Sequence, residues 1–86
     1  PQALRNPMAL DITLDGSILC VKDTRHSLIR TEIQTWYYDI ENWRVSSYGR
    51  EGDVPDRPMT PEGIAWVEKH FLPKVADQMQ APSPSV

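Results

Sequence analysis

The segment from Leu28 to Tyr48 constrains the fold more than any other part of this sequence. It contains two of the three tryptophans and all three tyrosines, together with several threonine, isoleucine and valine residues. Such side chains favour a pleated, half-buried surface, and the turn-like tetrapeptide Asp39-Ile40-Glu41-Asn42 divides the segment in two. The segment therefore predicts a β-hairpin around which the rest of the chain packs.

A helix is the alternative interpretation, because apolar residues between Ile29 and Trp43 also recur at helical spacings. In the favoured strand interpretation, residues alternate between two faces. One face carries Ile29, Thr31, Ile33, Thr35 and Tyr37, and the other carries Arg30, Glu32, Gln34, Trp36 and Tyr38. We expect the first face to be the core, with the C-terminal helix as the simplest cover for Trp36 and Tyr38 on the second.

The residues before this segment predict two more strands. Apolar and polar residues alternate over 9–14, and Ser17–Lys22 reads as a second strand. Asp15-Gly16 between them is a strong hairpin signal, because a type I′ turn requires positive φ at both central residues. The polar stretch Asp23–His26 predicts the next turn. Strands joined by short turns run antiparallel, so residues 9–48 predict a meander.

The composition changes after Tyr48. Residues 49–59 combine two glycines and two prolines with charged side chains, which predicts an exposed loop. Thr60-Pro61-Glu62 then predicts a helix, with Thr60 as its N-cap and Pro61 in the first helical position. Pro73 is expected to end that helix by about Leu72.

The sequence as a whole therefore predicts an α+β domain: an antiparallel β-meander of three or four strands with one C-terminal helix packed on a sheet face, in the order β-β-β-β-α. The domain is expected to span residues 8–80, with a flexible lead-in over 1–7 and a disordered tail over 81–86. The predicted apolar core consists of Leu10, Ile12, Leu14, Ile18, Ile33, Val45, Ile64, Val67 and Phe71.

Length and charge limit the classes of function. A chain of 86 residues is expected to form a single domain, and its longest wholly apolar run, Ile18–Val21, is too short to span a membrane. The N-terminal residues lack the basic and apolar regions of a signal peptide. Cys20 is the single cysteine, which fits a reducing compartment, and a cytoplasmic location is the expectation.

No motif for catalysis, metal or cofactor binding stands out. Cys20 lies inside an apolar strand, where a buried thiol is a more ordinary interpretation than a nucleophile activated by His26. Two histidines and one cysteine are too few for a zinc site, and the four glycines do not form a phosphate-binding loop. We therefore expect a non-enzymatic protein without a metal or cofactor.

Aromatic and arginine side chains on the sheet are the one group that predicts binding. The candidate partner-binding residues are Trp36, Tyr38, Arg44, Tyr48, Arg30 and Arg50. A net charge of −3 favours a protein partner, and the expected role is an accessory or regulatory binding module. Nucleic-acid binding through the sheet arginines is the alternative, because residues 22–50 carry five basic and four acidic side chains.

The order of elements also resembles that of the MbtH-like proteins. The residues that carry this resemblance are Asn6-Pro7, Asp15-Gly16, His26-Ser27-Leu28, Trp43-Arg44-Val45 and Ile64-Ala65-Trp66-Val67-Glu68. The resemblance implies a three-stranded antiparallel sheet followed by a helix, and an adenylation domain of nonribosomal peptide synthesis as the partner. This chain has Ile29-Arg30 where that family has Trp-Pro, so the resemblance supports a lesser alternative.

Overall fold

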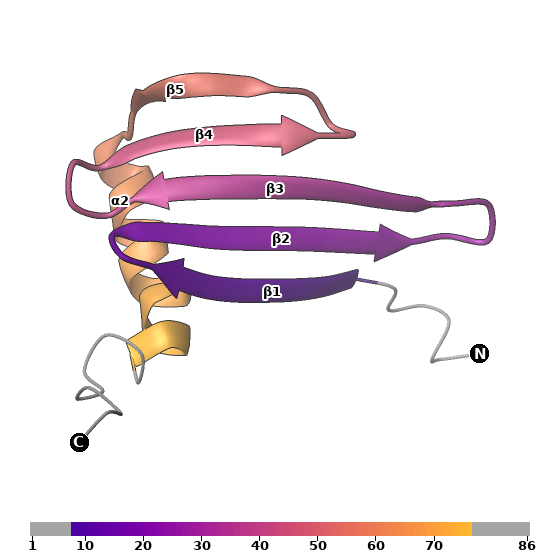
Figure 1. Ribbon diagram of the computed structural model, residues 1–86, viewed down its shortest axis with the longest axis horizontal. Coiled ribbons are helices and arrows are strands. Elements are labelled where there is room, and N and C mark those ends of the chain that lie inside the picture. The colour runs from indigo at the N-terminus through magenta and orange to yellow at the C-terminus, as the bar shows by residue number, and fades with distance from the viewer. Residues whose placement is uncertain (1–7, 77–86) are drawn as a thin grey trace.

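The computed structural model describes residues 8–76, which form one five-stranded antiparallel sheet with a helix across part of one face (Figure 1). The elements in chain order are β1 (Met8–Asp15), β2 (Ile18–His26), β3 (Thr31–Asp39), β4 (Arg44–Gly49), β5 (Val54–Pro58), α2 (Pro61–His70) and a 3-10 helix, η1 (Leu72–Val75). The predicted α+β class, the antiparallel meander and the C-terminal helix are confirmed. The predictions for residues 1–7 and 81–86 lie outside the described residues.

The fifth strand corrects the prediction that residues 49–59 form an exposed loop. β5 pairs antiparallel with β4, with an irregularity between Val45 and Ser47. Pro55 and Pro58 argued against a strand because proline cannot donate to a sheet ladder. An edge strand tolerates proline, since one side of its backbone needs no partner, and β5 is such an edge.

The first hairpin is confirmed, but its turn differs from the expected type. Asp15 pairs with Ile18, so the two loop residues are Gly16 and Ser17. Gly16 has φ of 62°, whereas Ser17 does not have positive φ. Positive φ at the first loop residue alone is the pattern of a type II′ turn, which favours glycine there.

The predicted turn at 23–26 is wrong, because those residues complete β2. The turn is Ser27–Arg30, and Ser27 holds it together: its Oγ accepts hydrogen bonds from the backbone N–H groups of Ile29 (3.2 Å) and Arg30 (3.1 Å). The Ser27 N–H donates to the Arg30 carbonyl at 2.9 Å. Since residues 31–39 form β3, the helical alternative for this segment is excluded.

The turn predicted around Asp39-Ile40-Glu41-Asn42 is confirmed. Asp39 Oδ1 accepts hydrogen bonds from the N–H groups of Glu41 (2.9 Å) and Asn42 (3.1 Å), and Asn42 Nδ2 donates to Asp39 Oδ2 at 3.1 Å. These bonds, those from Asn42 foremost, hold the pKa of Asp39 below its usual range. The chain then enters β4 through Trp43, which has φ of 53°.

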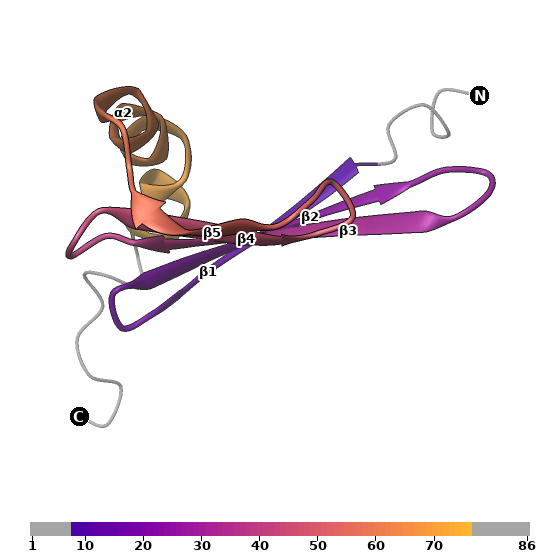
Figure 2. The same ribbon diagram turned by 90° about the horizontal axis from the view of Figure 1, so that it is seen from above.

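The helix begins as predicted, with Thr60 Oγ1 accepting a hydrogen bond from the Gly63 N–H at 3.1 Å. It ends at His70, slightly before the predicted end, and η1 follows. Figure 2 shows that α2 and η1 lie on one side of the sheet, and Figure 1 shows that they cover only the end where the β1–β2 and β3–β4 turns lie.

The core lies between these helices and that end of the sheet. Its buried apolar side chains are Leu19, Val21, Val45, Val67 and Val75. Ile12, Leu14 and Phe71 pack against it as predicted.

Three predicted core residues, Leu10, Ile18 and Ile33, are instead exposed. The expected core face of β3 is also wrong, because Leu19 and Val21 on the helix side pair with Tyr38 and Trp36. Strand residues alternate between faces, so this register turns Ile33 away from the helix.

Candidate functional site

A groove that contains three aromatic side chains, Trp36, Tyr38 and Trp66, opens between α2 and the β3–β5 side of the sheet. Its volume is about 200 Å³. We call it the aromatic groove, and the lining residues that matter below are Trp36, Tyr38, Arg57, Met59, Trp66 and Val67.

The sheet side of the groove is formed by two aromatic rings that stack on each other. Trp36 and Tyr38 stand two residues apart on β3, which places both on the face toward α2. Their rings stack with a centroid separation of 6.2 Å and an interplanar angle of 8°. Tyr38 also contacts Phe71, with ring centroids 5.8 Å apart, and burial raises the pKa of Tyr38 to about 12.

The helix side of the groove presents an exposed tryptophan above a buried valine. Val67 is 1% exposed and belongs to the core, whereas its neighbour Trp66 is 57% exposed. The Trp66 ring leans on His70, with ring centroids 4.0 Å apart, so the indole is held at the flank of the helix. An indole that is half supported and half open to solvent is an effective anchor for a partner.

Arg57 gives the groove an unneutralised positive charge. Arg25, Arg30, Arg44 and Arg50 each lie within 3.5 Å of a carboxylate oxygen. No ion pair within 4.0 Å involves Arg57 among the residues that the structure describes. The guanidinium of Arg57 is therefore available to an acidic group beside the aromatic walls.

The structure divides the six predicted partner-binding residues among three places. Trp36 and Tyr38 lie together in the aromatic groove. Arg44 and Tyr48 alternate with groove-side residues of β4 and so lie on the opposite face. Arg30 belongs to the β2–β3 turn and Arg50 follows β4, and both pair with Glu32 at the end of the sheet away from the helix.

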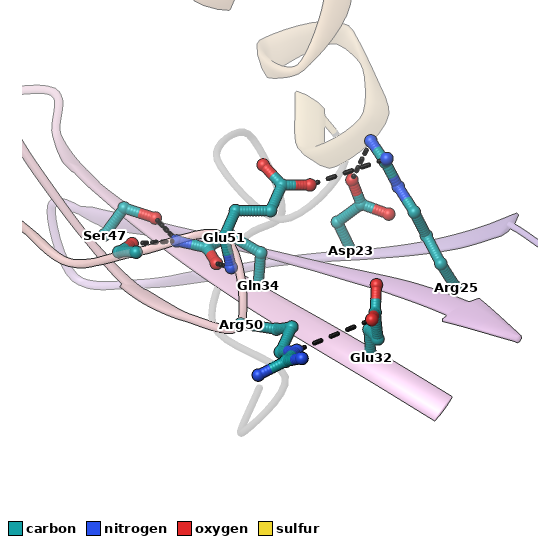
Figure 3. A network of polar contacts seen from close by, with 8 residues as sticks. Asp23, Arg25, Glu32, Gln34, Ser47, Arg50 and Glu51 are labelled. Atoms are coloured by element: carbon teal, nitrogen blue, oxygen red, sulfur yellow. Dashed lines mark hydrogen bonds and ion pairs between the residues drawn. The ribbon is translucent and has the colours of Figure 1, made fainter. Parts of the chain in front are cut away.

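A group of hydrogen-bonded side chains occupies that other end of the helix-side face (Figure 3). We call it the polar network: Asp23, Arg25, Glu32, Gln34, Ser47, Arg50 and Glu51. Gln34 is its centre and is only 3% exposed. Its Nε2 donates to Ser47 Oγ (2.7 Å) and to the Gly52 carbonyl (2.8 Å), and its Oε1 accepts from the Glu51 N–H (2.8 Å).

Ion pairs surround this centre. Arg25 lies 3.4 Å from Asp23 and 3.5 Å from Glu51, while Glu32 lies 3.0 Å from Arg30 and 3.5 Å from Arg50. With Arg30, which lies beside the network, three guanidinium groups balance its three carboxylates, and the pairs are solvent-exposed for the most part. The polar network therefore ties the β4–β5 connection to β2 and β3 and leaves no excess charge for a ligand.

The described residues contain no group of metal ligands, no helix that could span a membrane and no nucleophile paired with a base. Within residues 8–76, no three His, Cys, Asp or Glu side chains gather as metal ligands, and no helix is long and apolar enough to cross a membrane. Cys20 and His26 lie six residues apart on β2, roughly 20 Å along an extended strand. They are too far apart to act as a nucleophile and its base.

Comparison with models of protein families, with curated proteins and with solved structures finds no match to this chain.

Sequence reasoning found Trp36 and Tyr38 but missed the other half of the groove. Trp66 was not among the helix residues predicted as core, which are Ile64, Val67 and Phe71, and that spacing was the only signal that it faces partly outward. Arg57 lay in a segment predicted to be a loop. Its proximity to Trp36 depends on β5 joining the sheet, which the composition argued against.

Proposed function

We propose that the chain is a small non-enzymatic binding module, accessory or regulatory in kind, that holds one bulky apolar side chain of a protein partner in the aromatic groove. The observation that carries this proposal is the pairing of an exposed Trp66 with the stacked Trp36 and Tyr38 around an open space. Tryptophan, tyrosine and arginine are the residues enriched at the energetic centres of protein interfaces.

The size of the groove favours a side chain over a metabolite. Pockets for small-molecule substrates and drugs measure about 300–1,000 Å³. An apolar cavity of about 150 Å³ accepts a molecule as small as benzene. At about 200 Å³, the groove suits one leucine, isoleucine or phenylalanine side chain.

Arg57 favours a partner segment that carries a carboxylate near its apolar side chain. A guanidinium and a carboxylate form strong, charge-assisted hydrogen bonds, most of all when an apolar contact excludes water beside them. The chain as a whole has a net charge of −3, so long-range attraction does not bring an acidic partner to it. Arg57 therefore contributes selectivity at short range.

Nucleic-acid binding is the competing proposal. It requires several arginines free to contact phosphate groups. The four arginines on or beside strands β2–β4 each already pair with a carboxylate, which supports the protein partner. An adenylation domain is a lesser candidate for that partner, because this sheet has five strands where the MbtH-like proteins have three. A cytoplasmic setting is part of the proposal and is supported by the free thiol of Cys20.

Selection of peptides from a random displayed library, with the full chain as bait, tests this function. We expect the enriched peptides to share one bulky apolar residue with an Asp or Glu close by. Trp66→Ala is expected to weaken their binding at least tenfold, and Arg57→Glu to remove the preference for acidic residues. Tyr48→Ala, on the opposite face, is the matched control and should leave binding unchanged. Peptides that bind equally well to the parent and to Trp66→Ala would contradict the proposal.

A further inference from the structure

The β2–β3 turn exposes two aliphatic side chains at the end of the molecule that lies away from the helix. Leu28 is 98% exposed and Ile29 is 89% exposed. We call residues Ser27–Arg30 the hairpin tip. Figure 1 shows that the hairpin tip projects beyond the adjacent strands β1 and β4. Single exposed hydrophobic residues are ordinary, but two adjacent ones at the end of a projecting hairpin form an apolar protrusion.

The fold does not use these two side chains. The turn is held by the Ser27 hydroxyl, which also donates to the Arg30 carbonyl at 3.0 Å. Below it, His26 Nδ1 and Thr31 Oγ1 are hydrogen-bonded at 2.9 Å. All these contacts come from the backbone, a hydroxyl or an imidazole. Polar residues at positions 28 and 29 would therefore leave the turn intact, and the aliphatic pair suits contact with another molecule.

The surroundings of the hairpin tip favour a protein surface over a lipid bilayer. Three guanidinium groups behind the tip, those of Arg25, Arg30 and Arg50, are balanced by three carboxylates, those of Asp23, Glu32 and Glu51, so no excess of positive charge stands there. Two aliphatic side chains without a basic cluster give only marginal attachment to a membrane. A protein surface with an apolar pocket the size of one side chain therefore suits Leu28 or Ile29 better than a lipid bilayer does.

We propose that the hairpin tip of one copy inserts an aliphatic side chain, Leu28 or Ile29, into the aromatic groove of a second copy. This inference rests on the proposed function, because it names the partner of the same groove. The groove volume of about 200 Å³ matches one such side chain. Glu32, three residues after Ile29, is the carboxylate nearest the tip in the sequence. It already pairs with Arg30 and Arg50, but both pairs are solvent-exposed and such pairs are weak, so Arg57 of a second copy can compete for it.

The hairpin tip and the aromatic groove lie at opposite ends of the molecule, so the contact joins two different surfaces of neighbouring copies, in a head-to-tail arrangement. Trp36 lies five residues along β3 from Thr31, roughly 17 Å at the rise of an extended strand, so no copy can fill its own groove. A contact between two different surfaces forms open chains unless the rotation closes a ring. The surface it buries is well below that of a standard interface, so the association is weak and appears at high concentration.

Sedimentation equilibrium on two complementary variants tests the inference. The tip variant carries Leu28→Asp and Ile29→Asp, and the groove variant carries Arg57→Glu and Trp66→Ala. We expect the mean mass of the parent to rise with concentration, and each variant alone to associate at least tenfold more weakly. An equimolar mixture should form dimers and no larger species, since the tip variant keeps its groove and the groove variant keeps its tip. Tyr48→Asp, on the face of the sheet opposite the groove, is the control and should associate as the parent does.

Several results would overturn the inference. They are a parent that stays monomeric at every concentration, a tip variant that associates as the parent does, or a mixture that contains no dimer. Binding of the parent to lipid vesicles that is lost in the tip variant, without self-association, would assign the tip to a bilayer instead. Circular dichroism of both variants establishes that they are folded, and a groove variant that does not fold is replaced by Arg57→Glu alone.

A cyclised peptide of residues 25–33 provides a second measurement that keeps the two proposals apart. The peptide contains no tryptophan or tyrosine, so a change in the tryptophan fluorescence of the full chain reports binding to the groove. We expect a saturable change that is at least tenfold weaker with Leu28→Asp in the peptide. If this peptide does not bind while library peptides still require Trp66, the second copy is the wrong partner and the proposed function stands.

Discussion

The two ends of the helix-side face are shielded from solvent differently: one end by apolar packing beneath α2, and the other by the hydrogen bonds and ion pairs of the polar network. At the end beneath α2, the paired positions on β2 and β3 are apolar or aromatic, as with Val21 opposite Trp36. One alternation further along, the same strands place Asp23 opposite Gln34. The first pair packs against or beside the core, and the second belongs to the polar network.

The difference shows that a residue on this sheet is buried according to what packs over it, either a helix or the β4–β5 connection, and not according to the strand it belongs to. Gln34 and Ser47 are as buried as core residues, although they are polar and hydrogen-bond to each other. Their shielding comes from the β4–β5 connection, whose backbone groups satisfy the Gln34 amide. Hydrophobic contact stabilises one end. At the other end the Gln34 amide is fully hydrogen-bonded, although Asp23 Oδ1 is buried without a hydrogen-bond partner among the described residues.

The largest effect is expected from Leu19→Ala at the helix-covered end. Leu19 is fully buried, so truncation leaves a cavity and should lower the free energy of unfolding by about 2–5 kcal/mol. Ile18→Ala, the adjacent residue on the opposite face, should change it by about 0.5 kcal/mol or less. Urea denaturation measures both. Similar losses for the two variants would mean that the core is not on the helix side.

Gly49→Ala is expected to have the next largest effect, at the polar end. Gly49 has φ of 151°, and an added Cβ would clash with the carbonyl of Ile33 and lie 2.6 Å from Gln34 Oε1. Gly52→Ala is the control, because its φ of 122° carries a similar strain of about 1–3 kcal/mol while its Cβ meets no atom within 4 Å. Denaturation should show a larger loss for Gly49→Ala, and equal losses would argue against the close approach of β3 and β4 at this point.

Gln34→Leu tests the hydrogen bonds of the polar network directly. It leaves the Glu51 N–H and the Gly52 carbonyl without their side-chain partner, which should destabilise the protein by about 1–3 kcal/mol. Hydrogen exchange of the Glu51 amide should become fast. In Ser47→Ala that amide keeps its bond to Gln34, so its protection should persist. Unchanged protection in Gln34→Leu would show that the network does not hold the β4–β5 connection.

The smallest effect is expected in alkaline solution at the helix-covered end. Burial raises the pKa of Tyr38 from 10.0 to about 12, so folding favours its protonated form. The resulting stability is present below pH 10 and is lost as the pH rises from about 10 towards 12. Tyr38→Phe should make the urea midpoint less sensitive to pH in that range, and Tyr48→Phe serves as the comparison. A parent and a Tyr38→Phe variant with the same pH profile would contradict the burial of this phenol.

The sequence predicted the elements that local chemistry determines. Gly16 indicated the first hairpin, Asp39 the third turn, and Thr60 with Pro61 the start of the helix. Each of these signals acts within a few residues, so a single sequence contains it. The β2–β3 turn was misplaced because Ser27, rather than a glycine or proline, organises it.

Which strand residues face the helix, and where Arg57 lies in the groove, depend on contacts between segments that are distant in the sequence. The run Ile18–Val21 is apolar at every position, so it does not reveal which alternate residues face the helix. On β3, hydrophobicity favoured Ile33 over Gln34, but the amide of Gln34 is buried by partners from residues 47–52. Arg57 has no ion pair among residues 8–76, and no local pattern predicts that.

The sequential order of the strands has a consequence for how the chain folds. Each strand pairs with its neighbour in the sequence, so the sheet can form by successive hairpin closures, each of which joins segments that are close along the chain. Contacts of this kind favour a fast rate, whereas the docking of η1 beside β1 joins the two ends of the described chain and must await both. The transition state is therefore expected to contain the central hairpins, with Val75 among the last residues to reach its native contacts.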